Sequence, residues 1–510
     1  MMKLNNLLLA VGLMTCFFSC QEEKSCVKIV SSTIDHPWQT VLNAEIAKQD
    51  LNLTIGVGDS TLTIDPNAFL QTIDGFGACF NELGWTSLSL LSQEDRDSIF
   101  RELYAPGIGA NFTMNRMPLG CNDFSLDYYS YDDVDGDFDL KHFSITHDEA
   151  TLLPFIRAAK AQNPELRIWA SPWCPPAWMK TNKHYANTST EAIKQQYIAM
   201  YKNRPADAVQ EESGSVSMWN VDNGLEPAKQ IKEGEDGFIQ EEKYLEAYAR
   251  YFGKFIDAYR QKGIDIYMVM PQNEPNSAQW YPACTWTPQG LNNFLKYLGP
   301  EMEKRGVDVY LGTMERADTS LWETILGNAE SAKYIKGMGF QWAGGQALPV
   351  LHQKYPELKV YQSEQECGDG KNDLAGASHS WNLMRHYLSN GANGYFYWNI
   401  SLLEGGVSHW GWHQNSLVTV NEANKTFKFM PEYYVMKHVS HYVLPGAKVL
   451  KLGGDCKNAL AFLNTDGSLV VVLGNQTDKA LTLNLQFGKQ KQAFDVQLAA
   501  QSLSTLIIKK

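Results

Sequence analysis

The chain has 510 residues, of which 44% are hydrophobic, 12% aromatic and 20% charged, and its formal net charge is −13. This composition is that of a globular protein rather than a disordered chain, and the length allows one large domain plus a smaller one. The excess of negative charge would repel DNA or RNA, so it argues against nucleic-acid binding as the main function.

The first residues predict an export signal. Lys3 precedes an apolar run from Leu7 to Phe18, and Ser19-Cys20 follows it. A basic start, a short apolar stretch and a small residue at the cleavage point are typical of a secretory signal, and the run is too short to span a membrane comfortably. Because Cys20 follows a small residue, as in a bacterial lipobox, we expect residues 1–19 to be removed and Cys20 to be acylated. The protein would then be anchored by lipid at the bacterial cell surface (outer membrane), with free secretion as the alternative.

Segments near both ends of the chain alternate apolar and polar residues, which predicts β-strands. In the N-terminal part these segments are 51–55 and 62–64, and in the C-terminal part they are 468–473, 481–487 and 503–508. We therefore expect residues 20–70 to contribute strands to an all-β side domain, a β-sandwich formed mainly by residues 432–510.

Between these ends, short apolar runs alternate with longer helical patterns. The eight predicted strands lie at 75–80, 111–117, 166–172, 265–270, 307–314, 337–341, 359–363 and 394–399. The predicted helices include 94–103, 153–161, 242–262, 291–305 and 380–390. Eight such repeats predict the α/β class and a (β/α)8 TIM barrel over residues 71–431, with the polar stretch 183–240 as an insertion after the third strand. A doubly wound sheet is disfavoured because no G-x-G-x-x-G motif follows the first strand.

Carboxylates follow two of the predicted strands directly. Glu274 follows the fourth strand within Asn273-Glu274-Pro275, and Glu364 follows the seventh. Barrel enzymes hold their catalytic groups at these strand ends, and two carboxylates across the barrel mouth are what glycoside hydrolysis requires. Burial and negative neighbours should raise the pKa of the acid, and hydrogen bonds should hold down the pKa of the nucleophile. Taken alone, Glu274 could equally be a structural carboxylate.

Several sequence blocks occur in order along the chain: Gly75-Phe76-Gly77-Ala78, Arg116 with Asp123-Phe124-Ser125, Ala170-Ser171-Pro172-Trp173, Asn273-Glu274-Pro275, Ser363-Glu364, Trp398-Asn399 and Pro431-Glu432-Tyr433-Tyr434. Together they resemble glycoside hydrolase family 30, the family of lysosomal glucosylceramidase and of fungal and bacterial β-1,6-glucanases. The resemblance runs from about residue 75 to the C-terminus, and the family's side domain also joins N- and C-terminal strands.

The resemblance implies a retaining mechanism with Glu274 as the acid/base and Glu364 as the nucleophile. Glu366 competes for the second role but lacks the Ser-Glu context. A retaining mechanism predicts that the two carboxyl groups lie about 5–5.5 Å apart.

The resemblance also implies which residues bind the substrate. Arg116 and Asp123 would hold the terminal sugar, and Asn273 would bind its 2-hydroxyl. Trp173 and Trp398 would pack against sugar faces, although each could instead be a core residue. Three more residues at strand ends complete the predicted set: Gln341, Trp342 and Asn399.

After the sixth strand this chain reads Phe340-Gln341-Trp342-Ala343, whereas the glucosylceramidases have a His and a Tyr there. The sequences of residues 365–368 and 405–412 are more similar to those of the bacterial glucanases. We therefore expect a β-glucan or another β-linked oligosaccharide as the substrate, and most specifically β-1,6-glucan. A β-glucosidase, glucosylceramidase or β-xylosidase is the alternative within the family, and a noncatalytic surface glycan-binding lipoprotein is the alternative outside it.

No cofactor or metal is expected. The acidic run 133–137 resembles a calcium loop, but Ser144 stands where the bidentate Glu is needed. Seven cysteines follow Cys20 without a C-x-x-C pair, and we expect mostly small buried residues with room for one disulfide.

Overall fold

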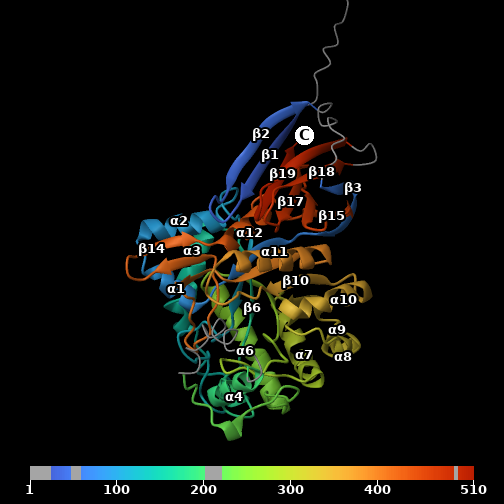
Figure 1. The fold of residues 1–510 in the computed structure, drawn as a ribbon. Coiled ribbons are helices and arrows are strands. Elements are labelled where there is room, and N and C mark those ends of the chain that lie inside the picture. Colours follow the sequence, from blue (N-terminus) through green and yellow to red (C-terminus); the bar gives the residue numbers. More distant parts are fainter. Residues whose placement is uncertain (1–23, 48–58, 202–220, 488–491, 510) are drawn as a thin grey trace, which may run out of the picture.

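The polypeptide folds into a barrel of parallel strands and a separate β-sheet that both ends of the chain build (Figure 1). The computed structural model describes residues 24–47, 59–201, 221–487 and 492–509. The predicted export signal with Cys20 and the predicted strand at 51–55 lie outside the described residues. Within the described ranges, no helix is both long enough and apolar enough to cross a bilayer.

Eight parallel strands close the barrel in the order β10-β11-β4-β5-β6-β7-β8-β9. Their bounds are β4 (Gly75–Cys79), β5 (Met114–Pro118), β6 (Arg167–Ser171), β7 (Ile266–Val269), β8 (Asp308–Met314), β9 (Ile335–Gln341), β10 (Lys359–Glu364) and β11 (Gly394–Asn399). Each overlaps one of the eight predicted strands, so the predicted TIM barrel is confirmed.

Helices alternate with these strands along the chain. Their bounds are α1 (Glu82–Ser89), α2 (Gln93–Tyr104), α3 (Leu152–Gln162), α4 (Thr190–Tyr201), α6 (Glu242–Gln261), α7 (Pro288–Glu303), α8 (Ser320–Leu326), α9 (Ala329–Ala332), α10 (Leu348–Lys354), α11 (Leu374–Ser389) and α12 (Pro431–Ser440). Helix α6 illustrates the pattern, because Leu245, Tyr248, Phe252, Phe255 and Tyr259 recur every three or four residues and are all buried. Such a stripe faces the core on one side of a helix.

The barrel interior is a packed core rather than a channel. Buried side chains from six of the strands or their ends form one cluster there: Met114, Trp169, Met268, Met270, Tyr310, Tyr361 and Phe396. The interior is therefore filled, and TIM-barrel enzymes hold their catalytic groups above such a core, at the carboxyl ends of the strands.

The second sheet has nine strands in the order β19-β18-β3-β15-β16-β17-β20-β1-β2. Their bounds are β1 (Lys24–Ser32), β2 (Gln39–Ala47), β3 (Ser60–Thr72), β15 (Lys448–Gly454), β16 (Ala459–Leu463), β17 (Leu469–Asn475), β18 (Leu481–Phe487), β19 (Gln492–Leu498) and β20 (Ser502–Lys509). The first strand pairs antiparallel with the last, β1 with β20. The predicted joining of both chain ends in one β domain is therefore confirmed, and this domain has an apolar core of its own.

Smaller elements lie outside these two units. Helix α4 and the short 3-10 helix Pro227–Lys229 occur in the predicted insertion 183–240, of which residues 202–220 lie outside the described part. Three short strands form a small sheet after the barrel: β12 (Ser401–Leu403), β13 (Val418–Asn421) and β14 (Thr426–Phe429). Seven cysteines are free in the described ranges and five of them are buried, so the expected bridge is not found there.

Candidate active site

Glu274 and Glu364 stand at the carboxyl ends of two barrel strands. Glu364 is the last residue of β10, and Glu274 lies five residues beyond the end of β7. Their side chains are almost completely buried, with exposed fractions of 5% for Glu364 and 4% for Glu274. The backbone of Glu274 has φ +48°, a conformation that is uncommon for a residue other than glycine and that often occurs at functional sites.

Arg116 of β5 binds Glu364. Its Nη1 donates to Oε2 of Glu364 at 2.5 Å, and the side chain of Arg116 has no exposed surface. The other guanidinium nitrogens are also occupied, because Nε and Nη2 donate to Oγ of Ser171 at 3.1 and 2.9 Å. Nη2 also donates to Oδ1 of Asn273 at 2.7 Å. One buried cation therefore connects the end of β10 with the residue that precedes Glu274.

The side chain of Asn273 is oriented by two donors. Its Oδ1 accepts hydrogen bonds from Arg116 and, at 2.9 Å, from Oγ1 of Thr313. Because both donors bind the amide oxygen, the amide nitrogen is the group left to donate to another partner. This orientation fits the predicted role of Asn273 as a donor to a sugar hydroxyl.

Glu274 receives neutral hydrogen-bond donors. Nε2 of Gln341 donates to its Oε1 at 2.6 Å, and the hydroxyl of Tyr281 donates to its Oε2 at 3.3 Å. Burial, followed by the charges of Glu364, Glu315 and Asp123, holds the pKa of Glu274 well above its usual range. A raised pKa favours the protonated form of this carboxyl, which is the form a general acid needs.

The pKa of Glu364 is also raised, and burial is the cause. Arg116 and then Trp342 oppose this rise. The prediction that hydrogen bonds hold the pKa of this carboxyl below its usual value is therefore wrong, because the cost of burying a charge exceeds the stabilisation by the guanidinium. The two carboxyls still differ in kind, since Glu364 is paired with a cation and Glu274 with neutral donors.

Asp123 is buried in the loop after β5, and its Oδ1 finds no hydrogen-bond partner in the described part of the chain. Burial and the charge of Glu364 raise its pKa well above the usual range. An unpartnered buried carboxyl oxygen is costly unless something binds it, so this atom is suited to a substrate hydroxyl.

Two of the predicted sugar-binding tryptophans pack on each other. The rings of Trp173 and Trp398 lie 5.0 Å apart at an angle of 28°, and both are buried. The guanidinium carbon of Arg116 lies 4.3 Å from the centre of the Trp173 ring. These two rings therefore support Arg116, whereas Trp342, which follows β9 directly, is only half-buried.

The amide of Asn399 is used within the protein. Its Oδ1 accepts a hydrogen bond from Asn81 at 2.8 Å, and its Nδ2 donates to Gln414 at 3.0 Å. Asn399, at the end of β11, therefore connects the loop after β4 with the segment between β12 and β13, and both ends of its amide are engaged within the protein.

Sequence reasoning missed Glu315, which follows β8 directly and is buried. Its Oε1 accepts a hydrogen bond from Ser277 at 2.8 Å, and Oε2 finds no partner within the described ranges. Burial raises the pKa of Glu315 to about 7. The signal that found Glu274 and Glu364, a carboxylate directly after a strand, could also have found this residue.

Sequence reasoning also missed an aromatic rim beside the carboxyl pair. Trp280 lies 5.1 Å from Tyr281 and 5.2 Å from Trp412, measured between ring centres. Its Nε1 donates to the backbone oxygen of Trp410 at 3.1 Å, and the Trp410 ring contacts Tyr128 at 5.2 Å. Trp412 and Tyr128 are half-buried, and the Tyr128 ring stacks on Tyr185 at 5.2 Å, so the rim is a packed aromatic cluster that is partly open to solvent.

A metal centre is not apparent at this site. Among the described residues, no three His, Cys, Asp or Glu side chains gather in a way that could hold a metal ion.

Comparison with known sequences identifies the family. The TIM-barrel domain of glycosyl hydrolase family 30 matches residues 73–236 and 215–443, and the β-sandwich domain of the same family matches residues 454–506. The chain belongs to glycoside hydrolase family 30. As a member of this family, the protein is a retaining glycoside hydrolase.

Relatives of different specificity are about equally similar to this family 30 enzyme. A putative glucosylceramidase of Caenorhabditis elegans is 26% identical, over 89% of this chain and 85% of its own. An endo-1,6-β-D-glucanase of Aspergillus fumigatus is also 26% identical, over 88% of this chain and 87% of its own. Among solved structures, an endo-β-1,6-glucanase shares the fold with a TM-score of 0.75 and 24% identity, over 95% of this chain and 100% of its own.

Proposed function

We propose that the protein hydrolyses β-1,6-linked glucan by double displacement, with Glu364 as the nucleophile and Glu274 as the acid/base. The observation that carries this mechanism is the bridge made by Arg116, which binds both Glu364 and the neighbour of Glu274. The negative charge of Glu364 also raises the pKa of Glu274, which supports two buried carboxyls near enough to act on one sugar, as a retaining glycosidase requires.

The first step forms a covalent intermediate. An oxygen of Glu364 attacks the anomeric carbon while the bond from that carbon to the leaving sugar breaks, and Glu274 gives its proton to the leaving oxygen. The raised pKa of Glu274 keeps this proton available near neutral pH. The ion pair with Arg116 favours the ionised form of Glu364 that attacks.

The second step releases the sugar. Glu274, now ionised, removes a proton from water, the water oxygen bonds to the anomeric carbon, and the bond to Glu364 breaks. Two inversions restore the β configuration. Asn273 would donate to the 2-hydroxyl, a bond that strengthens as the oxocarbenium-like transition state forms, and Asp123 would accept from other hydroxyls of the terminal sugar.

The aromatic rim favours a glucan over a lipid-linked glucose. Trp280, Trp412 and Tyr128 extend from the carboxyl pair through Tyr281, which itself donates to Glu274. Within this cluster Trp280 is buried and Tyr128 stacks on Tyr185. The half-buried ring of Trp412 is therefore the surface offered to a further sugar unit, whereas a ceramide needs a continuous apolar surface. The endo-1,6-β-glucanase relative is consistent with this choice.

The enzyme would meet such a polysaccharide outside the cell. We propose that it is exported and held at the bacterial surface by a lipid on Cys20. Growth with a labelled fatty acid should label the wild type, whereas Cys20→Ala should give an unlabelled protein. Equal labelling of both would exclude this anchor.

The activity is tested by incubating the enzyme with β-1,6-glucan, cellobiose, xylobiose and glucosylceramide and sizing the products. We expect β-1,6-glucan to be cleaved fastest and the β anomer to appear first by NMR. If one of the other substrates were cleaved faster, that compound and not β-1,6-glucan would be the preferred substrate. Binding of these sugars without any turnover would favour a glycan-binding protein.

Matched variants test the two carboxyls. Glu274→Gln and Glu364→Gln should both lose glucan hydrolysis. Glu366→Gln is the control, because the side chain of Glu366 is 55% exposed and lies 3.5 Å from His379, away from the buried pair. Full activity in Glu364→Gln together with its loss in Glu366→Gln would transfer the role of nucleophile to Glu366.

A further inference from the structure

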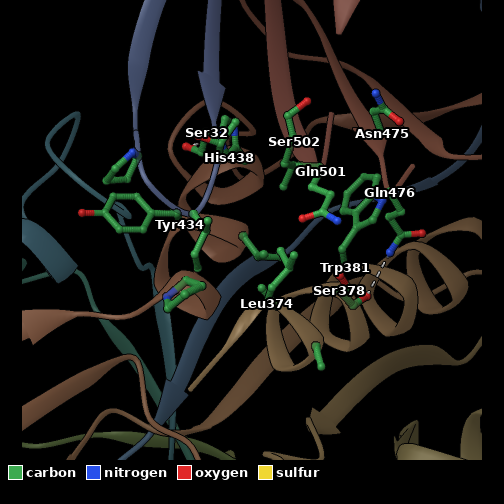
Figure 2. Close-up of a pocket in the computed structure, with 18 of the residues that line it drawn as sticks. Ser32, Leu374, Ser378, Trp381, Tyr434, His438, Asn475, Gln476, Gln501 and Ser502 are labelled. Atoms are coloured by element: carbon green, nitrogen blue, oxygen red, sulfur yellow. Dashed lines mark hydrogen bonds between the residues drawn. The ribbon is translucent and has the colours of Figure 1, made fainter. Parts of the chain in front are cut away.

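A cavity of about 470 Å³ lies between the barrel and the nine-stranded sheet, away from the carboxyl pair. Helices α11 and α12 form one side of it, and the turn after β1 and the ends of β17 and β20 form the other (Figure 2). Figure 2 shows Tyr434 and Trp381 on opposite sides of this cavity, with Gln501 between them. Small-molecule sites occur preferentially at such junctions between domains, in cavities of about 300–1,000 Å³.

The walls of the cavity carry no formal charge. The described residues that line it include no Asp, Glu, Lys or Arg, although 20% of the whole chain is charged. The one histidine, His438, binds Oγ1 of Thr505 and Oγ of Ser32, each at 2.8 Å. Burial lowers the pKa of His438 to about 3, so this ring is neutral as well. A charged ligand would lose its hydration here without gaining a counter-charge, so the cavity is suited to a neutral molecule.

The cavity is also preformed. Nε1 of Trp381 donates to Oδ1 of Asn458 at 2.5 Å, which fixes the orientation of the indole ring. Nε2 of Gln476 donates to the backbone oxygen of Ser378 at 3.4 Å, so the sheet and α11 are connected at one edge of the cavity (Figure 2). A ligand would not have to order the Trp381 ring when it binds, which lowers the entropic cost of binding.

The lining combines apolar surfaces with planar amides. Tyr434 and Leu374 present half-buried faces, and the exposed amides of Gln476 and Gln501 lie at the rim. Sugars have apolar C–H faces, which pack on rings and aliphatic groups, and hydroxyl edges, which exchange hydrogen bonds with amides. From the neutral lining, the amide rim and the preformed walls, we infer that this cavity binds an uncharged oligosaccharide, separately from the site of hydrolysis.

This site goes beyond the proposed function and does not depend on which linkage is cleaved. A glycan held at the domain junction would keep a polymeric substrate on the enzyme between cleavages, because binding at one site raises the effective concentration at the other.

The test uses the full chain carrying Glu274→Gln and Glu364→Gln together, so that no sugar is hydrolysed. It is titrated calorimetrically with tetrasaccharides of β-1,6-linked glucose, β-1,4-linked glucose and β-1,4-linked xylose. We expect at least one of these tetrasaccharides to bind twice, once at the carboxyl pair and once in the cavity. Adding Ala375→Trp, which places an indole on an exposed position lining the cavity, should remove one event. The matched control is Val350→Trp on α10, where the side chain is 62% exposed and outside the cavity, and it should keep both.

Gln476→Ala provides a second variant, which removes one rim amide without adding bulk and should weaken the same event. The inference is wrong if every tetrasaccharide gives a single event, if Ala375→Trp leaves two, or if n-decanol fills the cavity while no sugar does. Failure of the proposed function is a separate result, because it is measured as hydrolysis by the wild type, whereas the second site is measured as binding to the inactive variant.

Discussion

Arg116 and Glu364 form a buried ion pair in which Nη1 donates to Oε2 at 2.5 Å. Glu274, by contrast, is bound by the neutral side chains of Gln341 and Tyr281. Both carboxyls are buried, but only one is paired with a cation. This asymmetry favours ionisation of Glu364 over ionisation of Glu274, which is the division of roles that a retaining glycosidase needs.

The first prediction concerns Arg116. In Arg116→Lys the charge is kept but the guanidinium fork that binds Glu364, Ser171 and Asn273 together is lost. Because Arg116 lowers the pKa of Glu364, a weaker pairing should raise that pKa, and the acid limb of kcat/KM should move to higher pH. We expect kcat/KM at the optimum to fall about 10²-fold, since the carboxyl is also less well placed.

The measurement is a pH profile of kcat/KM for wild type and Arg116→Lys. Arg167→Lys is the control, because Arg167 lies at the opposite end of the neighbouring strand β6 and its guanidinium packs over Tyr267 at 4.0 Å. An acid limb that stays in place, or that moves to lower pH, would contradict the role given to Arg116.

The second prediction separates the two steps of the mechanism. Glu274→Gln cannot protonate the leaving oxygen, so glucan hydrolysis should fall about 10²–10⁴-fold. A 2,4-dinitrophenyl β-glucoside needs no such protonation, and its first step should be nearly unaffected. Stopped-flow measurement should therefore show a rapid burst of dinitrophenol followed by slow turnover. Equal losses with both substrates and no burst would count against Glu274 as the acid/base.

The barrel and its two carboxyls could be predicted because both leave local traces in the sequence. Each barrel strand is a short apolar run, and barrel enzymes hold their catalytic groups at the strand ends, where Glu274 and Glu364 stand. The domain formed by both chain ends could also be predicted, since the alternating pattern of 62–64 reappears after residue 468.

The partners of the carboxyls could not be predicted, because they depend on contacts between distant parts of the chain. Arg116 and Glu364 are 248 positions apart, and Gln341 and Glu274 are 67 apart. The stacking of Trp173 against Trp398 likewise depends on the closed barrel. A tryptophan at a strand end has the same sequence signature whether it faces a sugar or a neighbouring guanidinium.

The third prediction concerns Glu315 as a positioning residue. When ionised, it raises the pKa of Glu274, together with Glu364 and Asp123 and against the opposing charge of Arg116. Glu315→Gln removes one of the like charges, so Glu274 should lose its proton more readily. The basic limb of kcat/KM should therefore move to lower pH, while KM changes little.

Glu323→Gln is the control for this variant. It also removes one negative charge, but from a half-exposed side chain on α8 that pairs with Lys354 at 3.2 Å, so it should leave the basic limb in place. If Glu315→Gln reduced activity equally at every pH, the role of Glu315 would be structural. A shift of the basic limb to higher pH would also contradict the prediction, because loss of a negative charge should lower the pKa of Glu274.

The fourth prediction concerns stability, through His438 between the barrel and the sheet. Burial lowers its pKa from the ordinary 6.5 to about 3, so below pH 6.5 the unfolded chain binds a proton that the folded chain does not. The contribution of neutral His438 to the free energy of unfolding is therefore fully present above pH 6.5. As the pH falls from 6.5 towards 3, the free energy of unfolding decreases by about 1.4 kcal/mol per pH unit. Between pH 7 and pH 5 this residue should cost the wild type about 2 kcal/mol of unfolding free energy.

Urea unfolding at pH 7 and pH 5 measures this effect as a difference between variants. His438→Gln should be less stable than wild type at pH 7, because it loses a fitted ring that binds Thr505 and Ser32. It should nevertheless lose less stability than wild type on going to pH 5, since Gln takes up no proton. The exposed His409→Gln should behave as wild type at both pH values. If His438→Gln and wild type lose the same free energy between pH 7 and pH 5, the ring at the domain junction is not held neutral by the fold.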